Sequence, residues 1–224
     1  MWKSERRRRW ECSRSAEMLE QLIMNLNVFT FSDYWRQNYP DCPPVSYLFK
    51  WRLADRWFRF HSLPESKRYA ESQTEVSELL ARHNVVLLDV IGKGGECVLV
   101  ASSYAESNGM VDVSGCPELS NLLVHQLPAL PKQEFDPEPQ EEGEPPIYLR
   151  LACGNHILQI GSLDEVLLCV ADCRVTNFFV ISSKHQRIFA PYDGGVDVVL
   201  RDATERDEFK ARYEAWLSKH SDGL

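Results

Sequence analysis

The longest regular pattern in the chain is one helical face over residues 72–91, and it constrains the fold more than any other feature. Seven positions recur at the three- and four-residue spacing of a single face: Val76, Leu79, Leu80, His83, Leu87, Val90 and Ile91. Gly92 follows as the expected C-cap, and residues 96–102 form a buried, strand-like run. A long apolar helix face needs a sheet or further helices to cover it.

The second half of the chain supplies candidates for that sheet. Residues 147–152, 175–182, 187–190 and 196–200 are rich in β-forming side chains. Short polar and glycine-containing turns separate the last three runs, which is typical of an antiparallel meander. Ser162 with Glu165 predicts a capping box that opens a helix over residues 162–173. Thr204 with Asp207 predicts the cap of a final helix.

This order predicts an α+β fold with an antiparallel or mixed sheet and helices packed on one side. Four segments are expected. Residues 1–28 form a basic, amphipathic arm, and residues 29–130 an aromatic-rich α+β half. Residues 131–146 form an acidic, proline-rich loop or linker, and residues 147–224 an α+β half with a C-terminal helix. The pattern leaves open whether the two halves share one core.

Charge and cysteine usage narrow the class of protein. The chain has 25 Lys and Arg against 33 Asp and Glu, a net charge of −8, which argues against generic nucleic-acid binding by the whole chain. Its seven cysteines are odd in number and irregularly spaced, and no secretory signal precedes them, so we expect reduced thiols in a cytoplasmic protein. No apolar run reaches the length of a membrane span. No cofactor motif is recognisable, so none is expected.

A basic and aromatic cluster is the main candidate for a binding site. Residues 50–82 are locally basic in an acidic chain, and aromatic side chains are interleaved with the cations. Such surfaces bind phosphate, single-stranded nucleic acid or an acidic protein, whereas the structural alternative is core packing with arginine side chains extended towards solvent. The candidate binding residues are Arg56, Trp57, Arg59, His61, Lys67, Arg68, Tyr69 and His83.

Three further groups of residues are weaker candidates for a functional site. Cys153, His156, Cys169 and Cys173 are the ligand types that zinc prefers, in finger-like spacing, although a thiol on the apolar helix face also packs as a small hydrophobe. Cys153 with His156 has the residue types of a nucleophile and its base. Asp193 and Asp197 flank two glycines and could hold a divalent cation, but Asp-Gly-Gly is also hairpin chemistry.

Two stretches resemble a family of uncharacterised bacterial proteins with a domain of unknown function. They are residues 56–84, which contain RWFRFHSLPESKRY, and residues 188–218, which contain IFAPYDGGVD. The resemblance supplies no catalytic residues. Some of the relatives resemble immunity or accessory proteins of bacterial competition systems, which implies a protein partner.

We therefore predict a non-catalytic binding module, with an immunity-type or accessory-type role as one version. A protein partner is favoured, and a nucleic acid or phosphate ligand is the alternative. The competing hypothesis is an enzyme or sensor acting on a phosphorylated or nucleotide ligand, with His61, His83 and Arg68 around one pocket.

Overall fold

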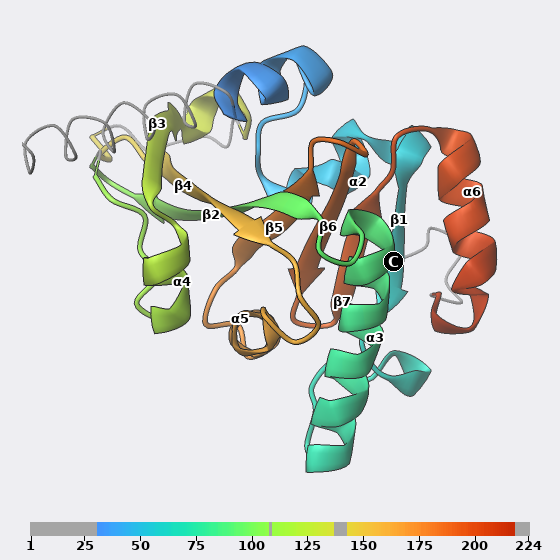
Figure 1. The fold of residues 1–224 in the computed structure, drawn as a ribbon. Helices are drawn as coiled ribbons and strands as arrows, with labels where there is room; N and C mark the ends of the chain where they lie inside the picture. The colour runs from blue at the N-terminus through green and yellow to red at the C-terminus, as the bar shows by residue number, and fades with distance from the viewer. Residues whose placement is uncertain (1–30, 108, 137–142, 218–224) are drawn as a thin grey trace, which may run out of the picture.

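The computed structural model describes residues 31–107, 109–136 and 143–217, and within them seven strands form one sheet (Figure 1). The strand order is β1-β7-β6-β5-β2-β4-β3, and every neighbouring pair is antiparallel. The strands are β1 (Trp57–His61), β2 (Glu96–Ala105), β3 (His125–Pro131), β4 (Tyr148–Ile157), β5 (Asn177–Ser182), β6 (Arg187–Tyr192) and β7 (Gly195–Val199). The predicted α+β class with an antiparallel sheet is confirmed.

Helices accompany this sheet along the whole described chain. The α-helices are α2 (Phe49–Arg52), α3 (Gln73–Ile91), α4 (Pro117–Leu122), α5 (Asp164–Ala171) and α6 (Ala203–Arg212), and residues 31–38 are also helical. Single 3₁₀ turns lie at Ser46–Leu48, Ala54–Arg56, Pro64–Ser66, Lys132–Glu134 and Glu214–Trp216. Among the described helices, none is long and apolar enough to cross a membrane.

The two halves of the chain interleave in the sheet. Strands β1, β2 and β3 come from residues 29–130, and each of them pairs only with strands from residues 147–224. The two halves therefore share one sheet. The predicted basic arm lies outside the described residues, as do positions 137–142 of the acidic segment. Phe135 of that segment is buried in the protein core.

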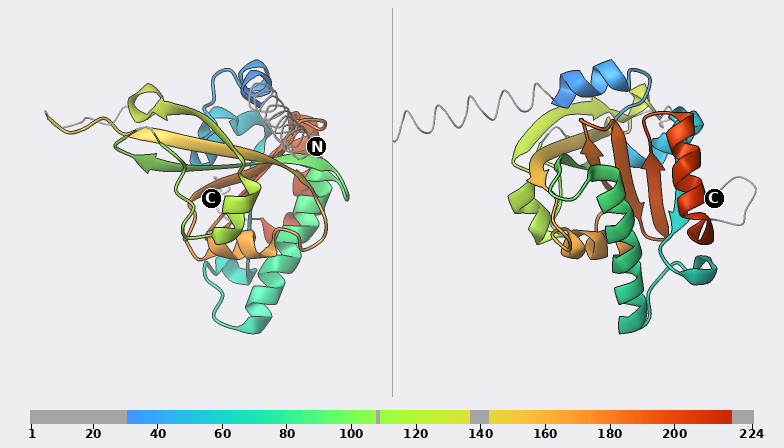
Figure 2. Two further views of the ribbon diagram at one scale, coloured as in Figure 1. Left: turned by 60° about the vertical axis from the view of Figure 1, so that its left-hand side comes forward. Right: turned by 45° about the vertical axis from the view of Figure 1, so that its right-hand side comes forward.

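The sheet carries a core on each face (Figure 2). The first core lies beneath α3, α4, α5 and α6, as the apolar face of residues 72–91 requires, and includes Leu87 and Phe209. The second core lies under the aromatic segment 31–53, where Trp35 and Phe49 pack against Phe179 of β5. Helices α3 to α6 lie on one side as predicted, and in addition helix 31–38 and α2 of the aromatic segment cover the other side.

The caps explain where the helices begin and end. Ser72 accepts a hydrogen bond from the backbone N–H of Glu75 at the start of α3, and Gly92 ends that helix with a positive φ of 92°. Helix α6 is capped by Asp202 instead of the predicted Thr204. The predicted capping box at α5 does not form, because the Ser162 hydroxyl lies at hydrogen-bond distance from the His156 ring and accepts from a nearby backbone N–H.

Candidate functional site

Strand β1 presents three of the eight predicted cluster residues on one face of the sheet and core residues on the other. Phe58 and Phe60 are buried in the first core, whereas Trp57, Arg59 and His61 are partly exposed on the opposite face. Successive side chains of a strand point to opposite faces of the sheet, which accounts for this alternation. Strand β1 pairs with β7 in a register that places Arg59 directly opposite Asp197.

Arg59 and Asp197 form a bidentate ion pair. Arg59 donates from Nε at 2.6 Å and from Nη2 at 2.9 Å to the two carboxylate oxygens. The side chains are 14% and 5% exposed, so the pair is largely shielded from water. The Tyr192 ring lies 4.4 Å from the guanidinium and closes the site further. Burial raises the pKa of the Asp197 carboxyl, and the hydrogen bonds from Arg59 oppose that rise.

The other cations of the cluster are paired as well. Arg68 Nε donates to Asp193 at 2.6 Å, and the Tyr69 hydroxyl donates to the same carboxylate at 3.0 Å. Asp193 remains acidic, since these hydrogen bonds outweigh burial and lower its pKa. Lys67 forms ion pairs with two carboxylates: Glu71, in the loop before α3, and Glu75, in the first turn of α3. These cations are therefore already neutralised from within the protein.

Arg56 is the cluster residue with the weakest hydrogen bonds. It reaches the carbonyl oxygens of Asn38 and Arg201 at 3.4 Å each, and its guanidinium lies 5.0 Å from the Tyr39 ring. It lines a cavity of about 330 Å³ together with Arg52, where three arginines face three aspartates. Trp57 packs against the second core, and its Nε1–H has no partner among the described residues.

His83 is fully buried on α3, away from the exposed cations. Its Nε2 lies 2.8 Å from the Ser62 hydroxyl, which is also fully buried, and its Nδ1 has no hydrogen-bond partner among the described residues. The rings of Phe60 and Phe189 meet the imidazole edge-on. Burial lowers the pKa of His83 to about 3, so the ring is neutral. A serine and histidine enclosed in this way have no access to a substrate.

The four candidate zinc ligands are not brought together. Cys153 lies in the second core and Cys169 in the first, so the sheet separates them. Cys173 is exposed and donates to Asp193 instead. Cys153 and His156 are three residues apart on β4 and therefore point to opposite faces, which also removes the predicted nucleophile and base.

The two carboxylates around the predicted hairpin turn do not form a shared cation site either. Asp193 is bound by Arg68 and Tyr69, whereas Asp197 is bound by Arg59. Each carboxylate therefore has its own arginine partner. The β6–β7 hairpin itself is present as expected, with Tyr192 paired to Gly195.

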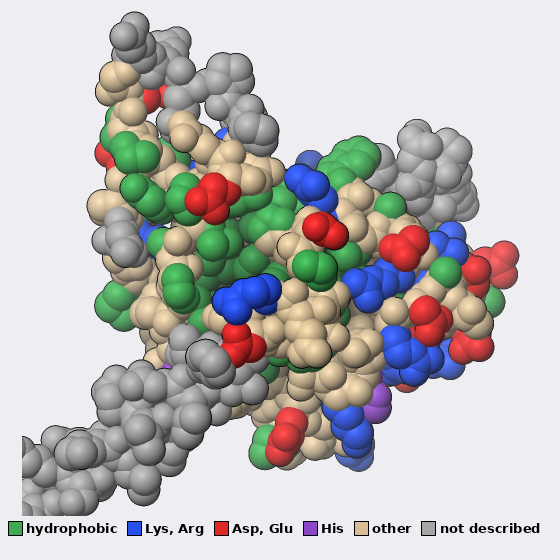
Figure 3. Space-filling model, turned by 90° about the horizontal axis from the view of Figure 1, so that it is seen from above, with side chains coloured by type: hydrophobic (Ala, Val, Ile, Leu, Met, Phe, Trp, Pro, Cys, Tyr) green, Lys and Arg blue, Asp and Glu red, His purple; other side chains and the backbone are tan. Residues whose placement is uncertain are grey.

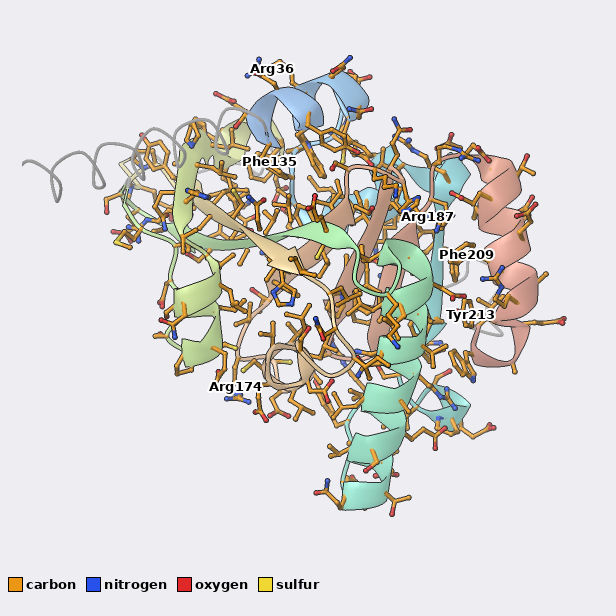
Figure 4. All side chains as sticks on the ribbon, in the orientation of Figure 1. Arg36, Phe135, Arg174, Arg187, Phe209 and Tyr213 are labelled. Carbon is orange, nitrogen blue, oxygen red and sulfur yellow. The ribbon has the colours of Figure 1, made fainter. Side chains whose placement is uncertain are left out.

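Sequence reasoning missed an apolar groove on the second face of the sheet. The groove encloses about 500 Å³ between helical residues 31–38 and strand β3. Apolar side chains form its walls: Phe31, Trp35, Tyr39, Leu127, Pro128, Leu130, Phe135 and Leu151. Figure 3 shows the face from above, with apolar side chains gathered in a hollow. Figure 4 shows Phe135 beneath the helix that carries Arg36. The aromatic density of residues 31–60 was the available signal.

Fold and site together define an α+β protein in which the cations of the basic and aromatic cluster are mostly paired internally and an apolar groove is open on one face. The chain belongs to the family of the domain of unknown function DUF3885, whose family model matches residues 45–221. This match contains both segments that carry the family resemblance, and the resemblance to a domain of unknown function is confirmed. No curated protein and no solved structure matches the chain.

Proposed function

We propose that the protein is a non-catalytic binding module that holds an apolar segment of a protein partner in the groove between residues 31–38 and β3. The observation that carries this proposal is the groove itself, a concave apolar surface of about 500 Å³. A bacterial, cytoplasmic setting is part of the same proposal.

The internal pairing of the cationic cluster supports a protein partner over a phosphate. Binding a phosphate would require Arg59 or Arg68 to leave a carboxylate at 2.6 Å, and for Arg59 the abandoned Asp197 would be buried without a counter-charge. The enzyme hypothesis also loses support, since one of its two proposed histidines, His83, is enclosed with Ser62.

The chemistry of the groove suggests what kind of segment it accepts. Strand β3 is an edge strand, but Pro128 and Pro131 lack the N–H groups that an added strand would need, so strand addition is disfavoured. The lining also carries both signs of charge: it includes two arginines and two acids, Arg36, Arg52, Asp41 and Glu134. We expect an amphipathic segment that inserts large apolar side chains and places mixed charges at the rim.

The immunity-type version of this proposal adds a basic toxin as the partner. The net charge of −8 favours that encounter, because opposite charge accelerates association. The immunity-type version predicts that the rate of association with a basic partner falls as salt concentration rises. The association rate of an accessory-type partner held mainly by apolar contacts should change little with salt.

The test compares partner capture by three forms of the full chain. Pro128→Glu places a charge in the groove at an exposed position, and Val124→Asp is the matched control just outside β3. We expect a protein from the source cell that the wild type and Val124→Asp retain and Pro128→Glu loses, as measured by quantitative mass spectrometry. A peptide from that protein's apolar segment should reproduce the pattern in a purified binding assay.

Two results would overturn the proposal. One is that Pro128→Glu and Val124→Asp capture the same set of proteins. The other is a thermal stabilisation by nucleotide or inorganic phosphate that Arg56→Ala abolishes, which would favour the enzyme or sensor hypothesis at the cavity beside Asn38.

A further inference from the structure

Two thiols and a carboxylate converge beside the first core, away from the groove. Cys116 precedes the first turn of α4, Glu118 lies within that turn, and Cys169 lies on α5. Their ligand atoms all fall within 4.8 Å of one another, and this is the one such cluster in the part of the chain that the structure describes. Helices α4 and α5 lie on the same face of the sheet (Figure 1).

The backbone around Cys116 is held tightly in this position. A Cβ at Gly115 would collide with the carbonyl oxygen of Arg174, just beyond α5, so the two segments approach more closely than any other residue would allow. The Arg174 guanidinium also donates to the Gly115 carbonyl at 3.4 Å. The position of the Cys116 thiol relative to α5 is therefore set by the fold.

We propose that Cys116, Glu118 and Cys169 bind a zinc ion, with a water molecule or another outside donor as the fourth ligand. Two sulfur atoms and one carboxylate oxygen are donors that zinc prefers. In tetrahedral zinc, a sulfur at about 2.3 Å and an oxygen at about 2.1 Å from the metal lie about 3.6 Å apart. The Cys116 Sγ and Glu118 Oε2 atoms are 3.5 Å apart, which matches that edge.

The exposure of the three residues fits an accessible site. Both thiols are buried, with 0% of Cys116 and 1% of Cys169 exposed, whereas Glu118 is exposed and provides the route from solvent. The site is not the one that the sequence suggested. Cys169 is shared with the predicted zinc set, but its partners come from α4 instead of β4.

Binding must release protons. Burial, and then the neighbouring Cys169, raise the pKa of the Cys116 thiol. Because zinc binds the thiolate form of cysteine, metal binding at this site releases protons to the buffer. Two thiolates and one carboxylate around Zn²⁺ leave a net charge of −1.

Cobalt(II) is a suitable probe, because it occupies tetrahedral thiolate sites and gives them visible and near-ultraviolet absorption. The full chain, reduced and stripped of metal, is titrated with Co²⁺ and then with Zn²⁺. We expect one equivalent of Co²⁺ to produce a thiolate-to-metal absorption band, and Zn²⁺ to abolish it. Proton release should accompany metal binding, measured with a pH indicator.

Matched variants locate the site. Glu118→Gln, an exposed change that leaves the core intact, should weaken Co²⁺ binding by about tenfold or more, and Cys169→Ser should abolish the band. Glu165→Gln, an exposed glutamate on α5, and Cys97→Ser, a buried thiol of the same core, should bind as the wild type does.

Three outcomes would overturn the proposal. The first is the absence of a thiolate band in the folded, reduced wild type. The second is an unchanged affinity in Glu118→Gln. The third is a Cys116–Cys169 disulfide, found by peptide mapping, that re-forms after reduction even with Zn²⁺ present, since the pair would then be a redox pair.

Discussion

Removing Arg59 should destabilise the protein far more than removing Arg68, although both belong to the same cationic cluster. Arg59→Ala leaves the Asp197 carboxylate, 5% exposed, without its counter-charge. Two charges about 4 Å apart at an effective dielectric constant of about 20 interact by about 4 kcal/mol. Breaking one side of a buried pair costs a similar amount, about 3–5 kcal/mol.

Arg68 provides the matched comparison. It also makes a 2.6 Å ion pair with an aspartate, but 63% of its side chain is exposed, so Arg68→Ala should cost far less stability than Arg59→Ala. Urea unfolding followed by tryptophan fluorescence measures both values. The dependence on urea concentration should stay unchanged in both variants, since the area exposed on unfolding is the same.

A double variant separates the charge effect from lost packing. Arg59→Met with Asp197→Leu removes both charges and keeps most of the volume, so it should recover much of the stability that Arg59→Ala loses. If Arg59→Ala costs no more than Arg68→Ala, the pair is not the buried contact that the distances describe. Arg59 would then be available to bind a ligand, and the argument against a phosphate site would fail.

Two further predictions follow from buried features. His83 binds no proton in the folded protein above pH 3, whereas its unfolded form takes one up below about pH 6.5, so unfolding free energy should fall by about 1.4 kcal/mol per pH unit as pH drops through this window. His83→Gln should lack that slope in urea titrations at several pH values, and an equal slope in both proteins would contradict the burial. Gly154→Ala should cost about 1–3 kcal/mol, because its Cβ would meet the Leu122 carbonyl oxygen. Gly109→Ala, which meets only a flexible arginine side chain, is the control in the same thermal melts.

The partners of the side chains in the candidate site could not be predicted from the sequence. The alternation along β1 puts Arg59 and His61 on one face. It could not show that Arg59 faces Asp197, since that depends on β1 lying beside β7 at the sheet edge. For the same reason the four candidate zinc ligands could not be judged from their spacing, because nothing in the spacing shows that the sheet separates Cys153 from Cys169.

Elements with a local signal were predictable from the sequence. The apolar face of α3, its Gly92 cap and the meander that ends in β7 follow from periodicity and turn chemistry within a few residues of each other. The order of the strands, the groove beside β3 and the convergence of Cys116 with Cys169 were decided only by the tertiary structure. These features depend on which distant segments pack together, and that choice minimises the exposed apolar surface of the whole chain.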